Sequence, residues 1–146
     1  MQVLNWMTKE VVTVDKATGV RAAADLMKAR NIRHLPVMEG ERLVGIVTDR
    51  DLREAMPPAS LLLDVHEADY LLDKVPVCDV MTKRVIGISP DVSIAKAADL
   101  MVRNKIGCLP VLEGDALVGI ITESDILRGV ADKQDMFEVP ISRAKE

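Results

Sequence analysis

Residues 45–51 read GIVTDRD, and residues 119–125 read GIITESD, so the same pattern returns 74 positions later. Working outward, residues 7–53 match residues 81–127 at this constant spacing without a gap. Smaller blocks recur with them: Met7-Thr8-Lys9 as Met81-Thr82-Lys83, and Leu35-Pro36-Val37 as Leu109-Pro110-Val111. Apolar positions can recur for packing alone, but a hydroxyl and a carboxylate that recur together indicate two equivalent polar sites. The chain is a tandem repeat.

The composition indicates one globular domain built from both copies. The chain has 146 residues, and each copy spans only about 50, a length at which an independent core is marginal. Apolar residues make up 49% of the chain and aromatic residues only 2%, so the shared core must consist of Val, Leu, Ile, Ala and Met. This composition favours a buried sheet covered by helices.

Charge and cysteine usage argue against several classes of function. The net charge is −4 and the Lys and Arg residues are scattered, so no basic surface for nucleic acid or for an anionic membrane is indicated. The sequence has no long apolar run and no signal-peptide pattern, and we expect a cytoplasmic protein. Cys78 and Cys108 lack a CxxC spacing and are not repeated, which predicts reduced structural thiols and no metal site.

Hydrophobic periodicity predicts the order β-α-β-β-α in each copy. In the first copy we expect a strand at Val11–Val14, a helix at Val20–Arg30, strands at His34–Met38 and Arg42–Thr48, and a helix after Thr48. In the second copy the first helix becomes 94–104, with Ser93 as its N-cap. Residues 43–47 and 117–121 are almost continuously apolar, which indicates strands buried on both faces.

The segment between the copies predicts a helix and not a flexible tether. Pro57-Pro58 must end the helix that follows Thr48. Apolar residues then recur as one face of a helix requires, at Leu61, Val65, Ala68, Leu72 and Val75. We expect this helix to pack on its own domain; an oligomer interface or a ligand lid is the alternative. The predicted organisation is repeat 1 at 1–58, a helical segment at 59–77, repeat 2 at 78–135 and a tail at 136–146, with no structure over 140–146.

The strongest functional signal is the pair Thr48 and Asp51, which returns as Thr122 and Asp125. Each pair stands where a strand is predicted to end and a helix to begin. Free N–H groups at a helix N-terminus suit phosphate, and the Thr hydroxyl adds a donor. The Asp cannot favour phosphate, but a carboxylate accepts hydrogen bonds from the two neighbouring hydroxyls of a ribose. Together the two side chains indicate a nucleotide.

The same Thr-x-x-Asp spacing is also a capping box, which satisfies helix N-terminal donors without any ligand. Two observations favour binding: the entire unit is duplicated, and a Gly recurs three residues before each Thr, at Gly45 and Gly119. Gly permits a close approach to the backbone. Capping and binding are compatible with each other.

These motifs resemble a pair of CBS domains, the tandem unit called a Bateman module. The resemblance covers residues 7–135 and rests on three blocks that appear in order in both copies: the Met-Thr lead-in, Leu-Pro-Val, and Gly-x-x-Thr-x-x-Asp. It implies an α/β (α+β) fold in which two β-α-β-β-α units pack about a pseudo-twofold axis. It also implies clefts for adenosine derivatives such as AMP, ADP, ATP or S-adenosylmethionine, and a homodimer of two modules.

Position by position, the resemblance assigns Asp51 and Asp125 to ribose, and Thr48 and Thr122 to the phosphate side. Arg50 would add a cation where the second copy has Ser124, so we expect unequal clefts, with more phosphate preferred on the Arg50 side. Arg33 and His34 would border that cleft, and Gly107 and Cys108 take their places in the second copy. Apolar positions around the base would be Val14, Ile32, Pro36, Ile88, Ile106 and Pro110, for which core packing is the alternative.

The function implied is that of a regulatory sensor, in which an adenine nucleotide alters the relation of the two repeats and so biases an unidentified partner protein. No required cofactor and no catalytic group are expected, because His34 and His66 are not duplicated with any partner. The alternative is a ligand-free dimerisation or interaction module whose Thr-Asp pairs only cap helices. A finer resemblance, over 49–81, is to stand-alone CBS proteins of the acetoin-utilisation type. Some of these carry a C-terminal ACT domain, and we expect this chain to be a shorter member or a truncated one.

Overall fold

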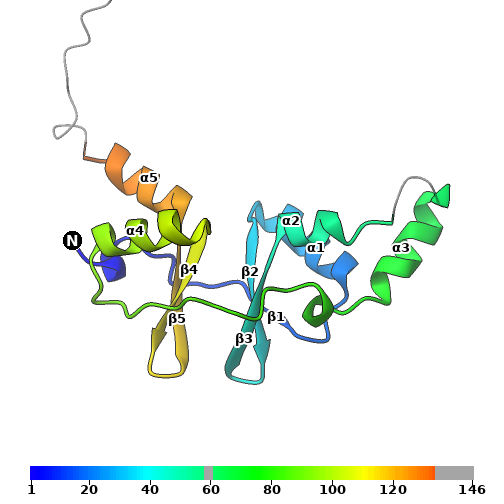
Figure 1. The fold of residues 1–146 in the computed structure, drawn as a ribbon, viewed down its shortest axis with the longest axis horizontal. Helices are drawn as coiled ribbons and strands as arrows, with labels where there is room; N and C mark the ends of the chain where they lie inside the picture. Colours follow the sequence, from blue (N-terminus) through cyan, green and yellow to red (C-terminus); the bar gives the residue numbers. More distant parts are fainter. Residues whose placement is uncertain (58–60, 134–146) are drawn as a thin grey trace, which may run out of the picture.

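The computed structural model describes residues 1–57 and 61–133 and places the sheets of the two repeats side by side, flanked by helices (Figure 1). The predicted tail at 136–146 lies outside the described residues. The first repeat contains β1 (Val14–Asp15), α1 (Val20–Arg30), β2 (His34–Glu39), β3 (Arg42–Thr48) and α2 (Asp49–Glu54). The helix α3 (Val65–Asp73) follows. The second repeat contains α4 (Ile94–Asn104), β4 (Cys108–Glu113), β5 (Ala116–Thr122) and α5 (Glu123–Ala131).

The predicted helices α1 and α4 and both predicted hairpins are confirmed. Gly40 and Gly114 turn the hairpins with φ of 61° and 59°, a region that Gly enters without steric cost. The Ser93 hydroxyl caps α4 by accepting from the N–H of Lys96, whereas α1 begins at Gly19 without a side-chain cap. Helix α2 ends before Pro57, as the ring of proline requires.

The helix between the copies packs on the first repeat. It covers a shorter range than the apolar spacing predicts, beginning at Val65, where Asp64 caps it by accepting from the N–H of Glu67. Leu72 is buried in the core of the first repeat, and an ion pair between Arg21 and Asp69 joins α3 to α1. Among the described residues, no helix has both the length and the apolar character that crossing a bilayer requires.

The first strand of each copy is shorter than predicted. Only Val14 and Asp15 form β1, which pairs in parallel with β2, so the first sheet has the order β1-β2-β3. In the second copy this strand is reduced to a single bridge between Ile88 and Val111, and the sheet consists of β4 and β5. These strands are short because the residues just upstream of each one lie against the sheet of the other copy.

The lead-in of each copy crosses to the sheet of the other copy. Thr8 exchanges backbone hydrogen bonds of 2.8 and 3.0 Å with Ile120 in β5, and Thr82 does the same with Ile46 in β3, at 2.8 and 3.0 Å. Residues 9–13 must then span the distance back to β2, which leaves the predicted strand mostly outside the sheet.

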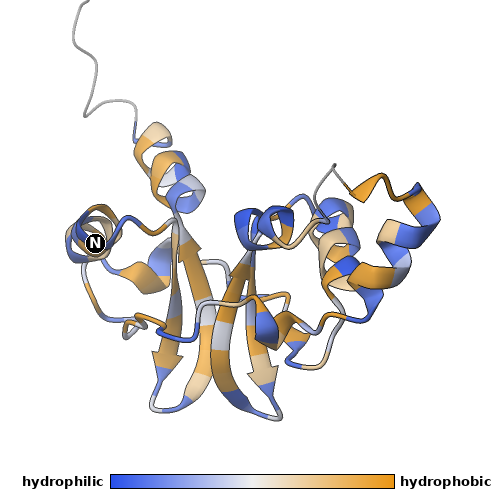
Figure 2. Ribbon diagram, turned by 45° about the vertical axis from the view of Figure 1, so that its right-hand side comes forward, coloured by the Kyte–Doolittle hydropathy of each residue, from blue (hydrophilic) through white to orange (hydrophobic). Residues whose placement is uncertain are grey.

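The packing of the two hydrophobic cores shows the same exchange of lead-ins. Val3, fully buried, packs in the core of the second repeat with Ile88 and Leu109, whereas its counterpart Val77 packs in the core of the first repeat with Leu35. By packing, one unit is therefore 9–82 and the other is 1–8 together with 83–133. A third small cluster, formed by Ile46, Cys108 and Ile120, joins the two sheets. Figure 2 shows the apolar residues concentrated on these central strands.

Gly45 and Gly119 accommodate the crossing lead-ins. A Cβ added to Gly119 would stand 2.6 Å from Sδ of Met7, and one added to Gly45 would stand 2.9 Å from the backbone oxygen of Thr82 and closer still to the side chain of Met81. No real Cβ tolerates such distances. The close approach that these glycines predict is thus made by a methionine of the other copy.

Candidate functional site

Both Thr-x-x-Asp pairs form complete capping boxes. The hydroxyl of Thr48 accepts from the N–H of Asp51 at 3.1 Å, while the Asp51 carboxylate accepts from the N–H of Thr48 at 2.9 Å. Thr122 and Asp125 make the same two bonds at 3.2 and 3.0 Å. Each Thr has extended backbone, so it ends its strand and starts its helix. The capping role that the spacing predicts is present in both copies.

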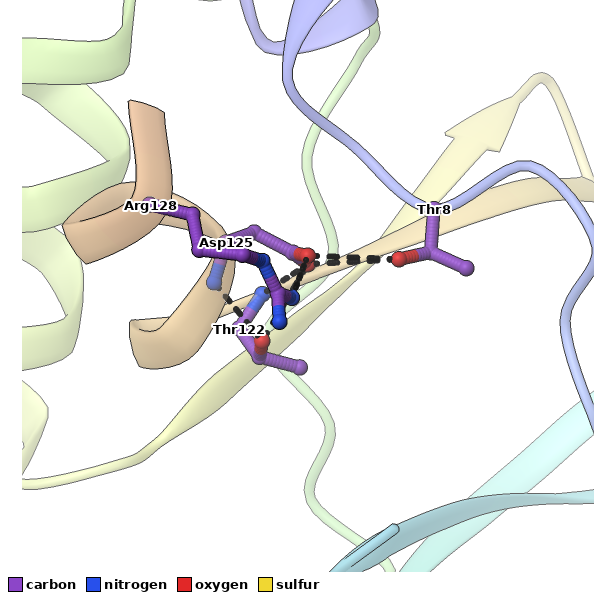
Figure 3. Close-up of polar contacts among 4 residues, drawn as sticks. All are labelled: Thr8, Thr122, Asp125 and Arg128. Carbon is purple, nitrogen blue, oxygen red and sulfur yellow. Dashed lines mark hydrogen bonds and ion pairs between the residues drawn. The ribbon is translucent and has the colours of Figure 1, made fainter. Parts of the chain in front are cut away.

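Asp125 has more hydrogen-bond donors around it than Asp51. It is 8% exposed and accepts three further hydrogen bonds: 3.1 Å from the Thr122 hydroxyl, 3.3 Å from the Thr8 hydroxyl and 2.9 Å from Nη2 of Arg128 (Figure 3). Asp51 is half-buried, and within the described residues its carboxylate has the N–H of Thr48 as donor. The two carboxylates, equivalent in sequence, therefore differ in environment.

A cleft of about 380 Å³ opens beside Asp125, a volume within the usual range of small-molecule sites. The second repeat supplies Thr122, Ser124 and Asp125 to its wall, and the crossing lead-in supplies Thr8 and residues 10–12. The first repeat supplies Ile32, Arg33, His34 and Pro36. We call this the Asp125 cleft.

The charges that line the Asp125 cleft are mixed. Its cations are Arg33 and Arg128, and its carboxylates are those of Glu10, Glu123 and Asp125. Arg128 is paired with Asp125, which leaves Arg33 as the second guanidinium of the wall. The lining therefore has a slight excess of negative charge.

His34 lies inside this wall, with Nε2 only 3.1 Å from the point that a Cβ on Gly107 would occupy. Burial lowers the pKa of His34, and the nearby carboxylates of Asp49 and Glu123 only partly oppose the shift. The imidazole is neutral at pH 7. Arg33 and His34 thus line the cleft with Ser124 and Asp125. They also adjoin the Asp51 side, because the N–H of Asp49 donates to the carbonyl of Arg33 at 3.0 Å and His34 pairs with Thr48 in β3.

Arg50 points along its own helix. Its Nε donates to Oε1 of Glu54 at 3.2 Å, and its side chain is 78% exposed. The packing of β3 against β5 brings residues of the first repeat close to the helix start of the second repeat. Outside the lining of the Asp125 cleft lie the candidates Thr48, Arg50, Asp51, Ile106, Cys108 and Pro110, each 74 positions from a cleft residue.

The remaining candidates have packing roles. Val14 and Ile88 are buried in the cores of the first and second unit respectively. Cys108 packs with Ile46 and Ile120 between the sheets, and burial raises the pKa of its thiol to about 12. This thiol stays protonated at neutral pH and is a poor nucleophile.

Several wall residues were not predicted from the sequence, namely Thr8, Glu10, Val11, Val12, Asn31, Ile120, Glu123 and Arg128. Thr8 had a usable signal, because its hydroxyl returns at Thr82 in the repeated lead-in. Arg128 had none, because the residue 74 positions earlier is Glu54.

Comparisons of this chain with known proteins agree on one family. A family model described as CBS domain matches residues 2–58 and 77–132. The CBS domain-containing protein YhcV of Bacillus subtilis is 32% identical over 120 residues, which cover 82% of this chain and 79% of that protein. The inosine-5'-monophosphate dehydrogenase of Thermoplasma acidophilum is 35% identical over 82% of this chain, but the match spans only 21% of that enzyme.

Solved structures show the same architecture. AcuB from Vibrio cholerae, a protein proposed to act in acetoin utilization, superposes with a TM-score of 0.77 at 33% identity, covering 93% of this chain and 94% of that one. The CBS domain pair of protein MJ0100, solved in complex with 5'-methylthioadenosine and S-adenosyl-L-methionine, superposes with a TM-score of 0.75 at 27% identity, covering 91% and 98% of the two chains.

Proposed function

This chain belongs to the CBS-domain family, and on that premise we propose that it is a regulatory module that binds an adenosine derivative in the Asp125 cleft. The observation that carries the proposal is the position of the Asp125 carboxylate, at a helix start and at the wall of a cleft that both repeats build. The complex of the MJ0100 domain pair with two adenosine derivatives supports it.

In this proposal the ribose hydroxyls bind the Asp125 carboxylate. The 5' substituent lies toward Thr122 and Ser124, where the partial positive charge of the N-terminus of α5 favours an anionic group. The base packs against the apolar part of the wall, near Ile32 and Pro36. One ligand would then touch both repeats.

The charge of the wall leads us to prefer ligands of low charge. Three carboxylates and two guanidinium groups disfavour a triphosphate, because each added negative charge meets Glu10 and Glu123. We therefore propose AMP or S-adenosylmethionine over ATP. The Asp51 side, where Arg50 stands in place of Ser124, remains a second candidate position with more phosphate preferred.

Regulation would follow from the shared wall. A ligand held by Asp125 from one repeat and by Ile32 to Pro36 from the other favours one arrangement of the two, and a partner protein that distinguishes arrangements would respond. We propose that this partner is cytoplasmic and that the module acts as a homodimer.

Isothermal titration with AMP, ADP, ATP and S-adenosylmethionine tests the proposal in the wild type, Asp125→Ala and Asp51→Ala. A charge-assisted hydrogen bond contributes about 1.5 to 3 kcal/mol, so Asp125→Ala should weaken binding in the cleft roughly ten- to a hundredfold. Asp51→Ala is a matched control. It removes the equivalent capping box of the first repeat, at a cost of ~1 kcal/mol in stability, and Asp51 lies outside the cleft. If Asp51 holds a second ligand, this control lowers the stoichiometry and leaves the first affinity unchanged.

The second candidate function is a ligand-free interaction module. Both capping boxes are complete, and Asp125 already has protein donors on both oxygens, which is what a purely structural carboxylate requires. The absence of heat and of any thermal shift in the wild type with all four ligands would favour this alternative.

A further inference from the structure

The Asp125 carboxylate has no acceptor position left for a ribose. A carboxylate offers about four lone-pair positions on its two oxygens. Oδ2 accepts from the N–H and the hydroxyl of Thr122, and Oδ1 accepts from the hydroxyl of Thr8 and from Nη2 of Arg128 (Figure 3). A ribose that presents two hydroxyls must displace two of these donors.

The four donors are not equally replaceable. The N–H of Thr122 belongs to the capping box, and its loss would weaken the start of α5. Arg128 is held only by its ion pair in the cleft, and its side chain is 70% exposed, so its guanidinium can move without being stripped of water. Because this guanidinium stays hydrated, moving it away from Asp125 costs less than displacing a buried cation would. Oδ1 is therefore the oxygen that a ribose can take, with Arg128 and the more distant Thr8 hydroxyl, at 3.3 Å, as the two donors that leave.

We propose that Arg128 is an internal competitor for the ribose position and thereby the residue that selects the ligand. In the empty cleft its guanidinium occupies Oδ1 of Asp125. A neutral nucleoside that displaces it leaves the guanidinium without an anion. A ligand that carries a phosphate or carboxylate on the 5' side gives Arg128 a new partner one turn into α5. The inference rests on the proposed function, which it refines by naming adenosine derivatives with an anionic group on the 5' side as the class preferred.

The competitor is specific to one half of the molecule. The position equivalent to Arg128 is Glu54, whose carboxylate pairs with Arg50 on the same helix. Arg103 on α4 provides a matched control: its side chain is 76% exposed against 70% for Arg128, it pairs with Asp99 on its own helix at 2.9 Å, and its removal changes the net charge by the same amount.

The experiment is titration of adenosine and AMP into the wild type, Arg128→Ala and Arg103→Ala. In Arg128→Ala we expect adenosine to bind roughly two- to fivefold more tightly, because it no longer displaces an ion pair. AMP should bind about tenfold more weakly, because its phosphate loses a charge-assisted contact. The preference for AMP over adenosine should therefore fall by more than about tenfold, whereas Arg103→Ala should keep the wild-type preference.

Other outcomes separate the inference from the function on which it rests. An unchanged preference in Arg128→Ala, with AMP still bound, would overturn the inference and leave the proposed function standing. An equal fall in Arg103→Ala would also overturn it, since long-range charge would then explain the result. If neither ligand binds the wild type or Arg128→Ala, both the inference and the proposed function are wrong.

Discussion

His34 is a neutral imidazole enclosed between the two repeats, and this makes stability depend on pH. Because burial lowers its pKa in the folded protein, the unfolded chain binds a proton more readily. Between the lowered folded pKa and the ordinary value of 6.5, the unfolded state carries more protons, so the free energy of unfolding rises with pH. The protein should lose stability as the pH falls below about 6.5.

The measurement is urea unfolding at a series of pH values from 7.5 to about 5 in the wild type, His34→Gln and His66→Gln. We expect His34→Gln to lose less stability on acidification than the wild type. His66 is exposed on α3 and serves as the control, whose variant should follow the wild-type curve. Parallel curves for all three proteins would show that His34 does not cause the dependence.

The crossing lead-ins determine which core each of two equivalent valines supports. Val3 and Val77 occupy the same position in the repeat and are both fully buried, but each packs in the unit opposite to its own copy. Val3→Ala and Val77→Ala should each lower the free energy of unfolding by about 2 kcal/mol. The two losses of stability should be similar in size, but each should affect a different core.

Amide hydrogen exchange can locate the loss. We expect Val3→Ala to increase exchange first in β4 and β5, and Val77→Ala to increase it first in β2 and β3. The opposite assignment, with Val3→Ala loosening β2 and β3, would show that each lead-in packs within its own copy. This pairing of variants needs no ligand and tests the fold alone.

Local patterns predicted much of the fold, because α1, α4 and the hairpins are each specified by residues close together in the chain. The exchange of lead-ins is not local. The sequence around Ile46 is nearly the same as the sequence around Ile120. The pattern therefore does not tell whether Thr8 pairs with Ile46 or, as in the structure, with Ile120. The same ambiguity hid a second neighbour of Arg33 and His34: the sequence groups them with Arg50, and the packing of β3 on β5 also brings them to Asp125.

The whole molecule consists of two units whose borders do not coincide with the borders of the sequence repeat. Every buried residue of the first core lies within 9–82, including Val77, and Thr82 pairs with β3. Two further backbone hydrogen bonds join residues 75–77 to the chain at the start of α1. The N–H of Val20 donates to the carbonyl of Val75 at 2.8 Å, and the N–H of Val77 donates to the carbonyl of Thr18 at 2.7 Å. A fragment that follows the packing keeps all of these contacts.

Fragments 9–82 and 1–74 have the same length but differ in this respect, which makes them a matched pair. Both are of a size at which stability is marginal, and both expose Ile46, which the second repeat normally covers. Fragment 1–74 also lacks Val77 and Thr82, while it keeps Val3 without the core that buries it. We expect 9–82 to show the higher urea midpoint by circular dichroism and slower amide exchange in β2 and β3. Equal behaviour of the two fragments, folded or unfolded, would mean that the crossing lead-ins do not define the unit that folds.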